Sequence, residues 1–275
     1  MKRTFTLLLC LCALNLCGQE VSIMSFNIRY DNPNDGEDQW AERKEALSGL
    51  IKYYEPAAMG VQEAVFDQMQ YLDSTLRQYS YIGVGRDDGV KGGEFSAIFY
   101  DSTRLALLDE GTFWLSTTPD EVSKGWDAAL PRICTYGLFR DRSSEKIFWV
   151  FNTHFDHIGE AARINSAALL VRRINEMNIG QNPVLLLGDL NSEPDDAPIQ
   201  LLNNNLKDAY LNSTKVYGPE GTFFGFDPMA LADRRIDYVF GKGLQFQSYR
   251  VIDDRRPNNR HISDHLPVLV NITLK

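Results

Sequence analysis

The apolar residues of the chain follow two different periods that alternate along its length. Alternating or continuous apolar runs predict β-strands, and the fully apolar run Val184-Leu185-Leu186-Leu187 is typical of a strand covered on both faces. Spacing of three and four residues predicts helices. The predicted strands span residues 21–30, 57–62, 96–100, 146–153, 184–189, 235–240 and 268–274, and the predicted helices span 40–54, 67–78 and 160–177. This alternation, without a low-complexity linker or a repeat, indicates an α/β domain.

The first residues have a different pattern, which is typical of a secretory signal. Lys2 and Arg3 precede an uncharged run that ends at Cys17 and is too short to span a bilayer as a helix. A buried helix would need a polar face, which this run lacks. We therefore predict a signal peptide over residues 1–18 and a single domain over residues 19–275.

A lipoprotein signal is an open alternative for the same segment. Residues 14–17 resemble a bacterial lipoprotein box, although Leu16 is large where a small residue is expected. That alternative would place the signal over residues 1–16 and a lipid anchor at Cys17. Either way, we expect an exported protein that is periplasmic, secreted or lipid-anchored at a bacterial cell envelope.

The charge of the chain limits the classes of partner. The sequence has 28 Lys and Arg against 37 Asp and Glu, a net charge of −9. Loss of residues 1–18 would remove two basic residues and no acidic ones, which leaves −11. This acidity argues against a broad basic face that coats nucleic acid, but it allows an enzyme that binds a few phosphates locally. Three of the four cysteines lie in the leader, so Cys134 has no internal disulfide partner and is expected to be buried.

Polar residues with catalytic potential follow the apolar runs, where the strands of α/β sheets end in a crevice. All four histidines fall in two short segments, 154–157 and 261–265. Six motifs appear in order: Asn27, Gln62-Glu63, Asn152-Thr153-His154, Gly188-Asp189-Leu190-Asn191, Asp237 and Ser263-Asp264-His265.

Together, these six motifs resemble the endonuclease/exonuclease/phosphatase superfamily over the whole mature chain. That superfamily includes deoxyribonucleases, abasic-site endonucleases, inositol-polyphosphate phosphatases, sphingomyelinases and deadenylases. The resemblance implies a four-layered α/β sandwich with two mixed β-sheets packed face to face and helices outside. It also implies an active site at one edge and divalent-metal-dependent hydrolysis of a phosphoester.

The oxygen-rich residues favour Mg²⁺ as the cofactor, with Mn²⁺ as a plausible substitute. Glu63 is the first choice of ligand, with Asn27 beside it through its amide oxygen and Asp264 nearby. A zinc site is disfavoured, because His154 and His157 have no Cys or HExxH pattern to complete a tetrahedral shell.

The resemblance also implies roles for five catalytic residues. Asp189 would orient or deprotonate the attacking water, and Asn191 would hydrogen-bond to water or phosphate. His265 would contact the scissile phosphate, with Asp237 accepting a hydrogen bond from its other ring nitrogen. His154 would donate to a phosphate oxygen from the opposite side.

Four further residues are candidates for binding the substrate: Arg29, Arg132, Arg260 and His261. The sequence thus predicts an exported, monomeric Mg-dependent hydrolase without a transmembrane helix that cleaves a small-molecule or lipid-linked phosphoester. A nuclease that acts on DNA or RNA with the same site is the alternative. A non-catalytic binding protein on this fold is a remote alternative, because Glu63, Asp189 and His265 are all present.

Overall fold

The computed structural model describes residues 20–227 and 229–274 of the chain. The predicted signal peptide and Cys17 lie outside the described residues, so export and lipidation remain predictions. Within the described ranges, no helix is both long and apolar enough to cross a membrane.

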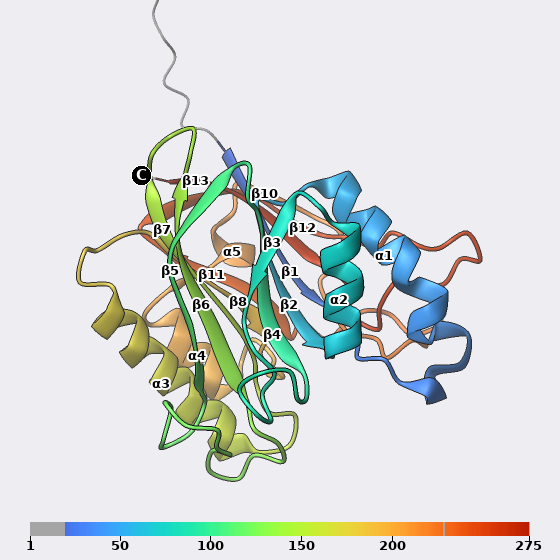
Figure 1. Ribbon diagram of the computed structural model, residues 1–275, viewed down its shortest axis with the longest axis horizontal. Coiled ribbons are helices and arrows are strands. Elements are labelled where there is room, and N and C mark those ends of the chain that lie inside the picture. The colour runs from blue at the N-terminus through green and yellow to red at the C-terminus, as the bar shows by residue number, and fades with distance from the viewer. Residues whose placement is uncertain (1–19, 228, 275) are drawn as a thin grey trace, which may run out of the picture.

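In the part of the chain that the structure describes, thirteen strands form two mixed sheets (Figure 1). The first sheet has the order β10-β12-β13-β1-β2-β4-β3, and the second has the order β5-β6-β7-β8-β11-β9. The strands are β1 (Glu20–Asn27), β2 (Ala58–Ala64), β3 (Tyr79–Ile82), β4 (Phe95–Asp101), β5 (Leu105–Trp114), β6 (Ile133–Asp141), β7 (Ile147–His154), β8 (Val184–Asp189), β9 (Lys207–Asp208), β10 (Lys215–Tyr217), β11 (Asp237–Lys242), β12 (Leu244–Val251) and β13 (Val268–Leu274).

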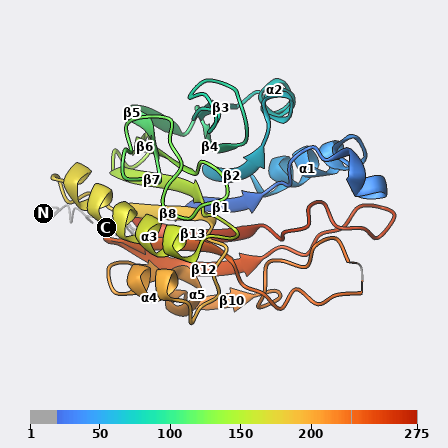
Figure 2. The ribbon, with the colours of Figure 1, turned by 90° about the horizontal axis from the view of Figure 1, so that it is seen from below.

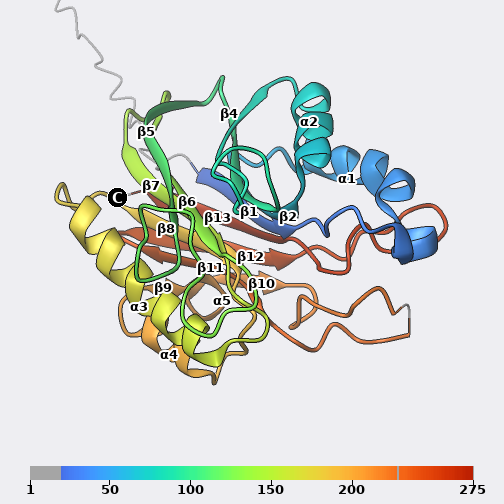
Figure 3. The ribbon, with the colours of Figure 1, turned by 60° about the horizontal axis from the view of Figure 1, so that its bottom comes forward.

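Helices cover the outer faces of the two sheets, and the shortest one, residues 209–212, packs instead against the core between them. The helices are the 3₁₀ segment η1 (Pro33–Asp38) and α1 (Trp40–Tyr54), α2 (Phe66–Thr75), α3 (Glu160–Met177), α4 (Ala197–Asn203) and α5 (Ala209–Asn212). Figures 2 and 3 show α1 and α2 on one side of the molecule and α3 and α4 on the other. The arrangement confirms the predicted α/β sandwich with two mixed sheets.

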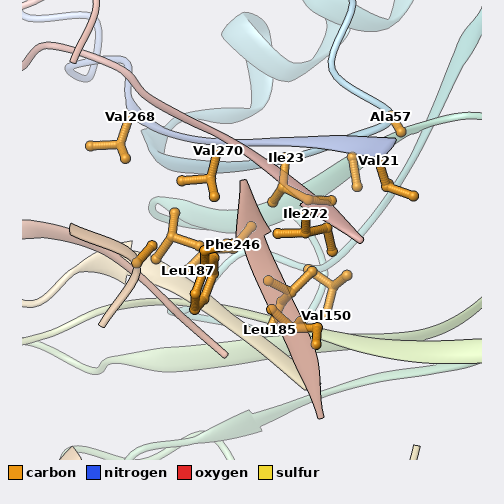
Figure 4. Close-up of a cluster of buried hydrophobic side chains, with 14 of the residues drawn as sticks. Val21, Ile23, Ala57, Val150, Leu185, Leu187, Phe246, Val268, Val270 and Ile272 are labelled. Atoms are coloured by element: carbon orange, nitrogen blue, oxygen red, sulfur yellow. The ribbon is translucent and has the colours of Figure 1, made fainter. Parts of the chain in front are cut away.

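The alternation of side chains along each strand produces the layers. In β8, Leu185 and Leu187 pack into the core between the sheets, whereas Val184 and Leu186 pack outward with residues of α3 and α4. In β1, Ile23 packs inward in the same way. Figure 4 shows the inward side chains of both sheets meeting in one cluster. Because every second residue faces the opposite side, a strand that is covered on both faces is apolar throughout, as the sequence predicts.

Polar side chains of β7 and β2 also lie in this interface, and they form hydrogen bonds between the two sheets. Asn152 of β7 donates to the carbonyls of Val61 (3.0 Å) and Ala97 (2.8 Å) in the first sheet. Its Oδ1 accepts a hydrogen bond from Gln62 Nε2 at 2.6 Å. Gly60 makes room for Asn152, since a Cβ at position 60 would lie 2.5 Å from Asn152 Oδ1. This contact fixes the position of β7 against β2, and both strands end at the site described below.

The substitution Gly60→Ala tests this inter-sheet contact. The added methyl group would also lie 3.1 Å from Leu187 Cδ1, so we expect a loss of about 1–3 kcal/mol in the free energy of unfolding, as for overpacked cores. Gly49→Ala in α1 is the matched control, because no atom lies within 4 Å of its Cβ position. Alanine there is expected to stabilise the helix by up to about 1 kcal/mol. Equal stability of the two variants in urea denaturation would contradict the proposed contact.

Candidate active site

Three neighbouring strands of the second sheet end with polar residues in one row. His154, the last residue of β7, is in register with Asp189, the last residue of β8. Asp189 is in turn in register with Asp237, the first residue of β11. Residues opposite one another on adjacent strands point to the same face. The register therefore brings an imidazole and two carboxylates together.

The first sheet adds Asn27 and Glu63 from the ends of β1 and β2. Glu63 lies at a β-bulge where the register with β4 shifts, and its φ of 65° is in the left-handed region. Bulges redirect side chains, and non-glycine residues seldom adopt this conformation. The Glu63 carboxylate accepts a hydrogen bond from Asn27 Nδ2 at 3.0 Å. Arg29 and Asn191 also have positive φ values, 59° and 45°, so three of the nine non-glycine residues with positive φ in the described part of the chain lie around this site.

Asp189 lies at the centre of the cluster. Its Oδ2 accepts a hydrogen bond from Asn27 Nδ2 at 2.9 Å and lies 3.5 Å from His154 Nε2 and 3.7 Å from His265 Nε2. Its other oxygen accepts the backbone N–H of Asn191 at 2.9 Å. Burial raises the pKa of Asp189 to about 7, with nearby His265 opposing this effect. Asp189 can therefore exchange a proton near neutral pH.

Asn191 and His154 hold each other in place beside Asp189. Asn191 Nδ2 lies 3.1 Å from His154 Nε2 and donates to the carbonyl of Phe155 at 3.0 Å. Burial, and the positive charge of Arg132 after it, lower the pKa of His154 well below its usual range. His154 is therefore a neutral imidazole at neutral pH.

His265 has the opposite charge state, because it is paired with Asp237. Its Nδ1 lies 2.8 Å from Asp237 Oδ2, and Thr222 Oγ1 accepts the Asp237 backbone N–H at 3.1 Å. Burial alone would lower the pKa of His265, but the carboxylates of Asp237 and Asp189 raise it to about 10. The folded-state pKa is thus above the usual value of about 6.5. The ion pair stabilises the fold fully below that value and loses its contribution as the pH rises through about 10.

The acidic residues of the cluster fit a divalent cation. Glu63, Asp189 and His265 each place one potential ligand atom within 4.8 Å of the others. His265 is an imidazolium that carries protons on both nitrogens, so the carboxylate oxygens are the available ligands, and Mg²⁺ prefers oxygen. Asp264 lines the same cavity, and burial raises its pKa, with the positive charge of His265 opposing this effect.

Asn27 lies among these carboxylates in an orientation that differs from the predicted one. Its amide nitrogen donates to Glu63 and Asp189, and its oxygen accepts the backbone N–H of Arg29 at 3.0 Å. The two carboxylates attract the N–H groups, so the amide oxygen faces away from them. Its role as a ligand through oxygen remains a prediction.

The cluster opens into a cavity of about 380 Å³. Fourteen residues line it: Tyr30, Glu63, Glu94, Leu130, Arg132, His154, His157, Asp189, Asn191, Phe223, Arg234, Ile236, Asp264 and His265. A cavity of this size is in the range of small-molecule sites. Of the four predicted substrate-binding residues, Arg132 is the one that lines it.

The other three predicted substrate-binding residues do not line the cavity, and each of them contacts at least one acid. Arg29 forms a two-bond pair with Asp35 and lies 3.8 Å from Asp264 and 4.0 Å from Glu63. Arg260 pairs with Glu37 and Asp38 of η1. His261 bonds to Asp253 at 2.8 Å and lines a second cavity together with Phe224. These contacts join loops around the site.

Glu94 also lines the cavity, although no motif of the sequence points to it. Glu94 immediately precedes β4, its Oε2 accepts a hydrogen bond from Arg86 at 2.5 Å, and it lies 3.8 Å from His154 Nδ1. Burial raises the pKa of Glu94 to about 7, with Arg86 opposing this effect. A charged residue before a strand is common, so its position in the sequence carries no distinguishing signal. Phe223 is a further cavity residue, and its ring centroid lies 4.8 Å from that of His265.

Residues 24–265 match the family model described as the Endonuclease/Exonuclease/phosphatase family. The chain belongs to this family. Its members hydrolyse phosphoesters, and the matched range includes every residue of the cluster, from Asn27 to His265.

Solved structures of this family share both sequence and fold with the chain. A family protein from Bacteroides vulgatus is 38% identical, covers 94% of this chain and 100% of its own, and superposes with a TM-score of 0.89. A mannosyl-6-phosphatase from Bacteroides thetaiotaomicron is 36% identical, covers 92% and 100%, and also has a TM-score of 0.89. An uncharacterized protein, L388, from Acanthamoeba polyphaga mimivirus is 29% identical over 84% of this chain and 91% of its own length.

The substitution Asp237→Asn tests the pairing of His265 with Asp237. Loss of the carboxylate charge is expected to lower the pKa of His265 by about 1–3, as measured by NMR titration of the metal-free protein. Asp253→Asn is the matched control, because it removes the equivalent partner of His261 and leaves His265 unchanged. A His265 pKa that stays near 10 in Asp237→Asn would show that Asp237 does not hold its proton.

Proposed function

We propose that the chain is an exported, Mg²⁺-dependent phosphatase that hydrolyses a phosphomonoester of a small molecule, with Mn²⁺ as a substitute cation. The position of Asp189 carries this proposal. Its carboxylate lies within 3.7 Å of two imidazoles, one neutral and one protonated, at the base of a cavity. Asp189 as proton acceptor, the positively charged His265 as phosphate-binding group and the neutral His154 as hydrogen-bond donor therefore face the same cavity.

The reaction uses these groups in distinct roles. Asp189 takes a proton from water as the water oxygen forms a bond to phosphorus. The bond from phosphorus to the ester oxygen breaks, and the leaving oxygen keeps the electron pair and takes a proton from solvent. His265 remains charged and stabilises the negative charge on the phosphate oxygens. Asn191 and His154 hold the water and a phosphate oxygen from the other side.

The proposed ligands of the cation are Glu63 and Asp264, with Asn27 beside them. When bound, a magnesium ion supplies positive charge to the phosphate oxygens during the transfer. The fold holds the carboxylate oxygens of Glu63 and Asp264 in position before the ion binds. The backbone N–H of Tyr30 donates to Glu63 Oε2 at 3.1 Å, which helps to fix that side chain.

Two observations support a small substrate over a polynucleotide. The arginines around the site are already paired with acids, as in Arg29 with Asp35, Arg132 with Asp156 and Arg260 with Asp38, so they do not form a free basic track. The mannosyl-6-phosphatase relative is named for a phosphomonoester of a sugar and is 36% identical. A nuclease with the same site is the alternative that the experiment below separates.

The variant Asp189→Asn tests the proposed activity. With Mg²⁺, the wild-type protein is expected to hydrolyse p-nitrophenyl phosphate, and a chelator is expected to abolish this activity. Asp189→Asn should lower kcat at least ~100-fold, because the proton acceptor is lost. Asp195→Asn, an exposed change six residues further on, is the matched control and should leave kcat unchanged.

Three results would contradict parts of this proposal. Near-normal turnover by Asp189→Asn would reject its role as the proton acceptor. Indifference to the chelator would reject the cation. A higher kcat/KM for an oligonucleotide than for the aryl phosphate would favour the nuclease.

A further inference from the structure

One wall of the catalytic cavity carries a carboxylate and a guanidinium for which the proposed hydrolytic step has no use. Glu94 immediately precedes β4 and Arg132 immediately precedes β6, and both line the cavity. The side chains are 18% and 5% exposed, respectively. They are therefore held in place at the cavity surface and cannot turn away into solvent.

Arg132 has one donor group left over in this arrangement. Its Nε donates to Asp156 at 3.3 Å, and its Nη2 lies 3.0 Å from His157 Nδ1. Its Nη1 is buried without a hydrogen-bond partner among residues 20–227 and 229–274, and lies 4.0 Å from Glu94 Oε2. A buried donor without a partner is costly, so a ligand atom that accepts from Nη1 would be favoured.

Glu94 supplies the complementary acceptor. Its Oε2 accepts from Arg86, whereas its Oε1 accepts no side-chain hydrogen bond within the described part of the chain. A carboxyl oxygen can accept hydrogen bonds, so Oε1 is free to accept one from a ligand. The wall thus offers one acceptor and one donor side by side.

The net charge of this wall selects the kind of ligand group. The two guanidinium groups of Arg86 and Arg132 are balanced by the carboxylates of Glu94 and Asp156. A second phosphate would gain little from a neutral wall and would be repelled by Glu94. A hydroxyl group both donates and accepts, so two neighbouring hydroxyls can satisfy Glu94 and Arg132 together.

We infer that Glu94 and Arg132 form a hydroxyl-binding subsite for the leaving group, and that the substrate is the phosphomonoester of a sugar or another polyol. This inference rests on the proposed phosphatase function and names its substrate class. A site built to bind hydroxyl groups rejects an analogue that lacks them, because its buried polar groups then stay unpaired. Specificity thus comes from the wall, and the chemistry comes from the Asp189 cluster.

The test compares two substrates with the same kind of leaving oxygen, mannose 6-phosphate and cyclohexylmethyl phosphate, which has no hydroxyls. The wild-type protein with Mg²⁺ is expected to prefer the sugar phosphate in kcat/KM by at least ~100-fold. Glu94→Gln should reduce this preference ~30-fold, the effect of losing a charged hydrogen bond, while kcat/KM for cyclohexylmethyl phosphate changes less than ~3-fold. Glu176→Gln, an exposed change on α3, is the matched control and should retain the full preference.

Each other outcome has a defined meaning. An equal loss on both substrates would overturn the inference, since Glu94 would then act on the reacting phosphate through His154. If the wild-type protein does not prefer the sugar phosphate over cyclohexylmethyl phosphate, the inference is overturned. This comparison needs no variant, so it decides the question even if the Glu94→Gln protein fails to fold. Preferred cleavage of a dinucleotide would also overturn the inference. If p-nitrophenyl phosphate is not hydrolysed either, the proposed function itself fails.

Discussion

The burial of several carboxylates at the junction of two sheets is the constraint around which this site is built. Glu63, Asp189, Asp237 and Asp264 all meet there, and water solvates them poorly. Asp237 is compensated by His265 at 2.8 Å, whereas Arg29 approaches Glu63 and Asp264 no closer than 3.8 Å. Buried charges need partners. The excess of negative charge therefore explains both the high pKa of His265 and the proposed cation.

The sandwich makes this concentration of charge possible. Each sheet supplies only part of the cluster, and the apolar side chains between the sheets hold the two parts together. The hydrogen bond from Gln62 to Asn152 connects the sheets close to the strand ends that carry the polar cluster. Left-handed backbone at Glu63 and Asn191 then directs side chains into the cavity. Strain of this kind persists where the surrounding fold enforces it.

The sequence was informative where residues are specified by period and order. The continuous apolar runs predicted doubly covered strands such as β8, and the six motifs predicted which strand ends meet, including Asp189 with His265. It was less informative about β5, β6 and β12, whose outward residues are partly exposed and give a weaker pattern. It did not point to Glu94, nor to the pairing of Arg260 with Asp38, because which acid an arginine meets depends on loops that are distant in the sequence.

The position of a bound cation would show whether the buried carboxylates hold a metal ion. Crystals grown with Mn²⁺ and inorganic phosphate would locate the ion by its anomalous scattering, independently of any activity. We expect a peak within coordinating distance of a Glu63 carboxylate oxygen, at about 2.0–2.3 Å, with phosphate between the ion and His265. A peak bound only elsewhere, or phosphate bound in the cavity with no ion beside Glu63, would contradict this expectation.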